Sequence, residues 1–164
     1  MVEQLRMDIT KLAPDAYKHL ISLEQTIAPK LEPKLYHLIK IRASQINGCA
    51  FCIAMHTDEA IRDGDSPDRI FLLDAWHESS AFSEKERAAL EWVEEVTLVA
   101  DTHAGKEAFD GLKRFFSEEE IGYLTLAAVM INAWNRIAIS SRAQYDREMF
   151  KQSVTQQQKV SEPA

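Results

Sequence analysis

The stretch QINGCAFCIAMH, residues 45–56, organises the rest of the chain and contains both of its cysteines. Asn47-Gly48 is typical of the end of a helix, because glycine adopts the left-handed conformation that closes a helix at little cost. The residues from Cys49 to about Asp63 lack glycine and proline and are rich in alanine, isoleucine and methionine, so they predict a second helix. A tight turn between two helices is therefore the predicted centre of the fold.

The two cysteines fall in the first turn of the second predicted helix. Three residues apart, Cys49 and Cys52 have Cβ atoms roughly 5–6 Å apart, which permits a disulfide after a small adjustment. His56 lies one turn beyond Cys52 on the same face. The helix dipole and unpaired backbone N–H groups favour a thiolate at this end. The dipole favours Cys49 as the nucleophile and His56 favours Cys52, and periodicity leaves the choice open.

Length and composition indicate one soluble domain. The chain has 164 residues, 46% hydrophobic and 27% charged, within the range of ordinary globular proteins. The net charge of −7 argues against nucleic acid as a partner, because phosphate binding needs clustered lysine and arginine. Charged residues interrupt the start of the chain before any apolar run as long as a signal peptide's. Two closely spaced cysteines without such a signal predict a cytoplasmic protein.

The rest of the chain shows helical patterns and no alternating strand pattern. Helices are expected to begin at Pro14, Pro33 and Pro67. Capping boxes at 83–86 and 117–120 predict two more helices, and the residues 105–116 predict a further short helix.

We therefore predict an all-α, single-domain bundle of about six to eight helices over residues 1–150, with residues up to Ala13 loosely held. Residues 151–164 are predicted to form a polar C-terminal tail. The apolar segment 121–139 is interrupted by asparagines and an arginine, so no membrane span is expected.

The cysteines and histidines, and Trp134, also have alternative interpretations as metal ligands or packing residues. Cys49, Cys52 and His56 supply three of the four ligands of a closed zinc site, and the chain has no further cysteine for the fourth. No metal is therefore expected. On spacing alone, His37 is interpreted as a packing or surface histidine. Trp134 is interpreted as a core or interface residue, with a substrate wall as the alternative.

The segment LYHLIKIRASQINGCAFC, residues 35–52, with His56 following, resembles the core motif of the alkylhydroperoxidase D (AhpD)-like proteins. These belong to the carboxymuconolactone decarboxylase superfamily. The match covers roughly residues 35–62, and NAWNR at 132–136 is similar to a helix that often follows in such proteins. The resemblance implies an all-helical protomer, assembly into homo-trimers or homo-hexamers, and peroxidase chemistry at the cysteine pair. The decarboxylase branch generally lacks this pair.

Residue roles follow from the resemblance. Cys52 would be the thiolate that attacks the peroxide, Cys49 the resolving cysteine, and His56 the residue that activates Cys52. The family places a glutamate twelve residues before the first cysteine, and His37 occupies that position here. We therefore expect that no negative charge orients His56, and that His37 acts in the site as a proton shuttle.

The predicted function is a thiol-dependent peroxidase that reduces hydrogen peroxide or alkyl hydroperoxides in an antioxidant role. It would bind no cofactor and would depend on an external dithiol, such as a thioredoxin-like or lipoyl-type reductant. One alternative is a thiol-disulfide oxidoreductase without a peroxide substrate. Another is a non-catalytic helical module that binds zinc or serves assembly.

Overall fold

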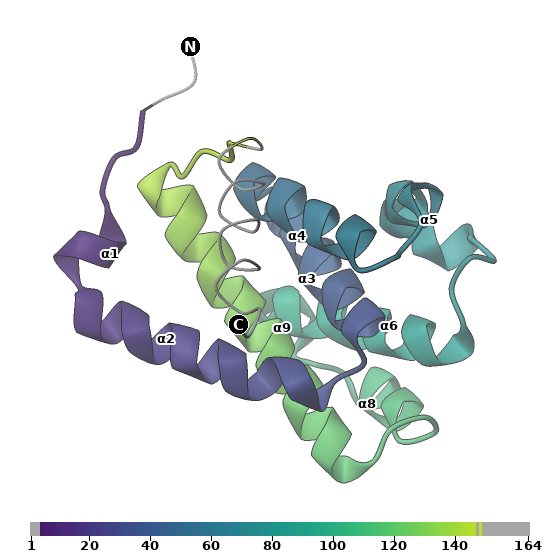
Figure 1. Ribbon diagram of the computed structural model, residues 1–164. Coiled ribbons are helices and arrows are strands. Elements are labelled where there is room, and N and C mark those ends of the chain that lie inside the picture. The colour runs from purple at the N-terminus through teal and green to yellow at the C-terminus, as the bar shows by residue number, and fades with distance from the viewer. Residues whose placement is uncertain (1–3, 147, 149–164) are drawn as a thin grey trace, which may run out of the picture.

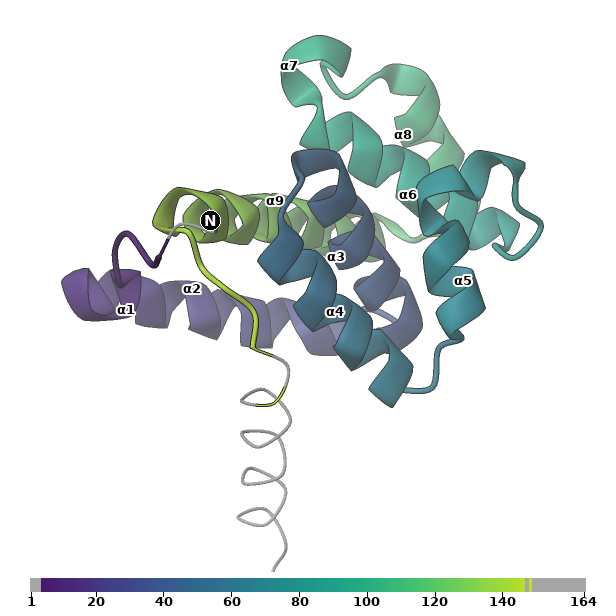
Figure 2. The same cartoon turned by 90° about the horizontal axis from the view of Figure 1, so that it is seen from above.

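Helix α3, Pro33–Asn47, is the central element of the fold. The structure is a computed structural model, and it describes residues 4–146 and 148. Helices α4 (Ala50–Arg62), α6 (Glu84–Thr97) and α9 (Glu118–Ser141) all pack against α3, as Figures 1 and 2 show. Because neighbours cover α3 on several sides, most of its residues are buried, including the polar His37 and Lys40.

The described part of the chain is all-α, which confirms the predicted fold class. Two of its nine α-helices, α1 and α7, are single turns of four residues, so the seven longer helices fall within the predicted number. The remaining elements are α1 (Ile9–Leu12), α2 (Pro14–Ile27), η1 (Ala28–Lys30), α5 (Pro67–Leu72), η2 (Leu73–Glu78), α7 (Val99–Thr102) and α8 (Lys106–Leu112).

Local sequence explains where the main helices begin and end. Proline occupies the first position of α2, α3 and α5, where its missing N–H costs nothing. Gly48 ends α3 at a φ of 68°, in the left-handed region that favours glycine. The capping boxes predicted for α6 and α9 are both formed, with Ser83 and Ser117 as the caps. Several predicted helix starts are therefore confirmed at the residue level.

A cluster of buried amides joins the end of α3 to α9. The side-chain N–H₂ of Asn47 donates to the oxygens of Asn132 and Asn135, at 2.9 and 2.8 Å. Asn135 in turn donates to the hydroxyl of Ser44 at 2.9 Å. Since buried amides without partners are costly, this cluster ties the turn that precedes Cys49 to one position on α9. The polar interruptions of the longest apolar segment thus have a structural role.

The N-terminal segment is more tightly placed than the sequence indicates. The backbone N–H of Arg6 donates to the carbonyl of Ser141 at 2.8 Å, and Asp8 caps α1. Within the described residues 4–13, these contacts differ from the expectation of a loosely held segment, since the partner of Arg6 lies at the other end of the chain. The predicted tail, residues 151–164, lies outside the described residues. No helix among the described residues combines the length and the apolar character needed to cross a membrane.

Candidate active site

Both cysteines lie at the N-terminal end of α4 and form a disulfide. Cys49 is the N-cap and Cys52 lies in the first turn, with 5.3 Å between their Cα atoms. The backbone N–H of Cys52 points at the sulfur of Cys49 at 3.3 Å. The predicted helix start and the predicted proximity of the two sulfurs are confirmed.

A pocket of about 400 Å³ opens beside the disulfide, and Cys52 and His56 both line it. Most of its wall is apolar and comes from distant parts of the chain: Leu5, Met7, Ile9, Tyr17, Ile21, Phe51, Met55, Trp134, Ile137 and Ala138. Trp134 packs against the hydrophobic core, as predicted, and also lines this pocket. The pocket places a reactive sulfur and an imidazole against a largely apolar space.

His56 is held by a carboxylate of its own helix. The Nδ1 atom of His56 lies 2.7 Å from Oε2 of Glu59, which also lines the pocket. Burial lowers the pKa of His56, although Glu59 opposes the shift, so the imidazole is neutral near pH 7. Burial alone would raise the pKa of Glu59, but His56, Lys40 and His37 bring it below its usual value. An ionised Glu59 accepts a hydrogen bond from the Nδ1–H group of a neutral imidazole, which leaves Nε2 as the basic nitrogen.

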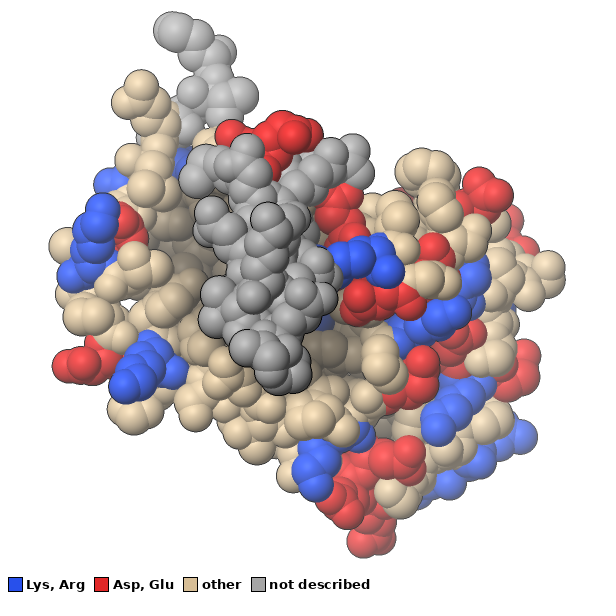
Figure 3. All heavy atoms as spheres, in the orientation of Figure 1, with Lys and Arg blue, Asp and Glu red and all other residues tan. Residues whose placement is uncertain are grey.

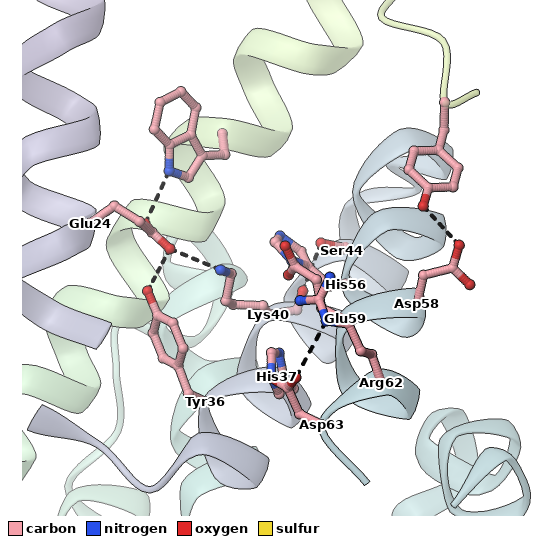
Figure 4. A network of polar contacts seen from close by, with 12 residues as sticks. Glu24, Tyr36, His37, Lys40, Ser44, His56, Asp58, Glu59, Arg62 and Asp63 are labelled. Atoms are coloured by element: carbon pink, nitrogen blue, oxygen red, sulfur yellow. Dashed lines mark hydrogen bonds and ion pairs between the residues drawn. The ribbon is translucent and has the colours of Figure 1, made fainter. Parts of the chain in front are cut away.

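A buried ion pair, Lys40 with Glu24, lies beside the His56–Glu59 hydrogen bond. Lys40 donates to Glu24 at 2.9 Å, and Tyr36 and Trp134 donate to the same carboxylate at 2.5 and 3.1 Å. Burial would raise the pKa of Glu24, but the charge of Lys40 and these donated bonds lower it. Figure 4 shows Lys40 between Glu24 on one side and His56 with Glu59 on the other. The polar floor of the pocket thus holds one cation between two carboxylates.

His37 pairs with Asp63 and has no hydrogen bond to the other predicted site residues among those described. Its Nε2 atom is 2.9 Å from Asp63, and its buried Nδ1 atom has no hydrogen-bond partner among the described residues. It is not among the described residues that line the pocket. The expectation that His56 lacks an orienting carboxylate is wrong, because Glu59 provides one from within α4.

Sequence reasoning missed Glu59, Lys40 and Glu24. Glu59 was detectable, because it follows His56 by three residues on one helical face. The Lys40–Glu24 pair carries no local signal, since it joins α2 to α3.

The described residues include no group of three histidines, cysteines, aspartates or glutamates placed to hold a metal ion.

Comparison with known proteins shows similarities in both sequence and structure. The model of the carboxymuconolactone decarboxylase family matches residues 14–95. The uncharacterized protein YdfG of Bacillus subtilis is 38% identical over 136 residues, which are 82% of this chain and 92% of the relative. A protein of unknown function from Agrobacterium tumefaciens, proposed as the antioxidant defence protein AhpD, is 45% identical, with a TM-score of 0.85 over 87% of this chain and 99% of that one.

The debrominase Bmp8 shares the fold at 22% identity and a TM-score of 0.73, over 84% of this chain and 75% of its own. At that identity the similarity is one of architecture.

Proposed function

The chain belongs to the carboxymuconolactone decarboxylase family, and from this premise we propose that it is a thiol-dependent peroxidase for hydrogen peroxide or alkyl hydroperoxides. One observation carries the proposal: Cys52, His56 and Glu59 line the same pocket. That set contains a sulfur nucleophile, a base and the group that orients the base. The 45% identity to the Agrobacterium protein, proposed to act in antioxidant defence, supports this class of chemistry.

The oxidative half-reaction starts from the reduced cysteines. His56 accepts the proton of the Cys52 thiol, and the helix N-terminus stabilises the thiolate. The sulfur attacks the terminal oxygen of the hydroperoxide, so an S–O bond forms and the O–O bond breaks. His56 returns the proton to the leaving oxygen, which departs as alcohol or water. The products are a Cys52 sulfenic acid and a neutral imidazole.

Cys49 then resolves the sulfenic acid. Its sulfur attacks that of Cys52, an S–S bond forms and water leaves. The Cα atoms are already at a distance compatible with this bond. An external dithiol must return two electrons to the pair before the next turnover.

The surrounding charges support a neutral, oriented base. Lys40 lowers the pKa of His56 by its charge, whereas Glu59 raises that pKa and holds the ring. His37 is proposed as a further member of the proton pathway. Its buried Nδ1 atom has no partner among the described residues, and its charge contributes to the lowered pKa of Glu59.

The pocket favours an organic hydroperoxide. A space of about 400 Å³ with mostly apolar walls is larger than hydrogen peroxide requires. We expect an alkyl or aryl hydroperoxide to be reduced in preference to hydrogen peroxide, because its apolar group leaves water on binding.

Stopped-flow mixing of the reduced protein with hydrogen peroxide and with cumene hydroperoxide tests the proposal. Oxidation should be much faster than that of free cysteine at the same pH. Cys52→Ser should abolish it, and Cys49→Ser should leave a sulfenic acid that mass spectrometry detects as one added oxygen. Oxidation no faster than that of free cysteine would leave the disulfide oxidoreductase as the remaining redox function.

We further propose that the protein is cytoplasmic and assembles into a homo-trimer or homo-hexamer. Leu126 and Val129 of α9 are 42% and 49% exposed, an apolar pair suited to a subunit contact. On the face in Figure 3, basic and acidic side chains are interspersed on the right-hand side, and we propose no nucleic-acid partner. Light scattering coupled to gel filtration would give the number of subunits.

A further inference from the structure

The two cysteines of the disulfide line different pockets. Cys52 lines the pocket of His56, described above, whereas Cys49 lines a second pocket of about 480 Å³. Phe51, Ala138 and Ala143 line both pockets and therefore form the partition between them.

Helical geometry explains this division. In an α-helix, residues three or four apart share a face, and residues two apart lie on nearly opposite faces. Cys52 therefore shares its face with His56 and Glu59, toward the first pocket. Ala50 and Ala54 line the second pocket, where Cys49 joins them as the N-cap. Cys49 and Cys52 are only 1% and 2% exposed, so each sulfur is reached chiefly through its own pocket.

The wall of the second pocket is held by specific contacts. Tyr145 donates its hydroxyl to Asp58 at 2.7 Å, and its ring meets Phe51 edge-on at a centroid distance of 5.9 Å. Gly48 and Ile139 complete the side next to Cys49. A recessed sulfur at the end of such a pocket suits a small or extended thiol better than the surface of a folded protein.

The direction of attack decides which cysteine becomes the leaving thiolate. A thiolate that attacks one sulfur of a disulfide approaches along the S–S axis and expels the other sulfur. Attack on Cys49 comes from the second pocket and expels Cys52 beside His56 and the helix N-terminus, where a thiolate is stabilised. Attack on Cys52 would come from the first pocket and would expel Cys49 instead.

We propose that the reductant and the hydroperoxide use separate entrances, with a small dithiol entering the second pocket and attacking the sulfur of Cys49. This inference rests on the proposed redox cycle. The dithiol thiolate bonds to Cys49, the Cys49–Cys52 bond breaks and its electron pair stays on Cys52. The second thiol of the reductant, after losing its proton, displaces Cys49. The reductant leaves as a cyclic disulfide, and the protein has gained two electrons.

Two neighbouring residues provide a matched pair of variants. Ala54 lines the second pocket and not the first, whereas Met55 lines the first and not the second, and both are half-buried. Ala54→Phe should slow reduction of the disulfide by dithiothreitol by about tenfold or more, because the new ring fills the approach to Cys49. Met55→Phe should leave that rate unchanged. The fraction of reduced protein is followed by acid quench, alkylation and mass spectrometry.

In oxidation by a hydroperoxide, the expected order of the two variants is reversed, so that Met55→Phe is the slow one. Cumene hydroperoxide should oxidise reduced Ala54→Phe at the wild-type rate and reduced Met55→Phe more slowly. The inference is overturned if Ala54→Phe is reduced at the wild-type rate, or if both variants lose the same factor in reduction. Ala50→Phe repeats the test at an exposed residue of the second pocket, where a large side chain disturbs no core.

Failure of the peroxidase proposal and failure of this inference are distinguished by different measurements. If wild-type oxidation by peroxide is no faster than that of free cysteine, the peroxidase proposal fails, and reduction by dithiothreitol still decides the entrance. A Cys52→Ser background offers a further measurement, because iodoacetamide must then reach Cys49 alone. Ala54→Phe should slow that alkylation and Met55→Phe should not. The reverse pattern would overturn the inference.

Discussion

The carboxylate of Glu59 lies 2.7 Å from Nδ1 of His56, one turn further along the same helix. The imidazole of His56 is therefore oriented by a carboxylate from the next turn of α4, not by a residue of another helix. The orientation of the His56 ring therefore depends on Glu59 of α4. Its pKa also depends on the charges of Glu24 in α2 and Lys40 in α3.

Glu59→Gln should slow peroxide oxidation of the reduced protein by about tenfold, less than the roughly 10²–10⁴-fold that a general base itself contributes. The amide oxygen of glutamine can still accept a hydrogen bond from Nδ1–H, but the charge that raises the pKa of His56 is lost. Stopped-flow kinetics measure the effect. Glu91→Gln, at an exposed position of α6, is the control and should retain the wild-type rate. Equal rates for both variants would contradict the role of Glu59.

Lys40→Met should move the acid limb of the pH–rate profile to higher pH. Burial and the charge of Lys40 both lower the pKa of His56, so the wild-type base stays neutral, and active, below its ordinary value of about 6.5. Without the lysine, the pKa rises and the imidazole becomes protonated at a pH where the wild type still works. Lys40→Arg keeps the charge and should keep the limb in place. An unmoved limb in Lys40→Met would refute this assignment.

His37→Gln separates proton transfer from packing. Glutamine can retain a hydrogen bond to Asp63 but does not exchange a proton near neutral pH. If His37 belongs to the proton pathway, His37→Gln and His37→Ala should both slow oxidation of Cys52. A wild-type rate in His37→Gln, with folding intact by circular dichroism, would assign His37 to packing.

Asn135→Ala should lower the free energy of unfolding by about 2 kcal/mol, because it leaves buried polar groups of Asn47 and Ser44 with fewer partners. Urea denaturation measures the change. Ser140→Ala, at an exposed position of the same helix, should change the unfolding free energy by less than about 0.5 kcal/mol. A similar effect for both substitutions would show that the amide cluster does not stabilise the fold.

Local spacing was sufficient to predict the all-α fold, the helix starts and the grouping of Cys49, Cys52 and His56. These features depend on residues within one or two turns of each other, where periodicity and capping act. Glu59 is within the same reach, because it follows His56 by three residues on one face of α4.

The rest of the pocket was beyond local reasoning. Lys40 meets Glu24 across two helices, and the walls come from the start of the chain and from α9. Tertiary packing decides such contacts, and no spacing in one sequence encodes them. Asn135 is an example: in the sequence it interrupts an apolar segment, and in the structure it connects two helices.

The first described residues contribute to the shape of the pocket but not to the reactivity of the thiols. Leu5 and Met7 help to enclose the pocket but supply no reactive group, whereas the sulfurs and the imidazole belong to α4 and its cap. A fusion tag or truncation at the start of the chain would therefore be expected to alter which substrates are preferred before it alters thiol reactivity. Comparisons of substrate preference among preparations should use chains with the same first residue.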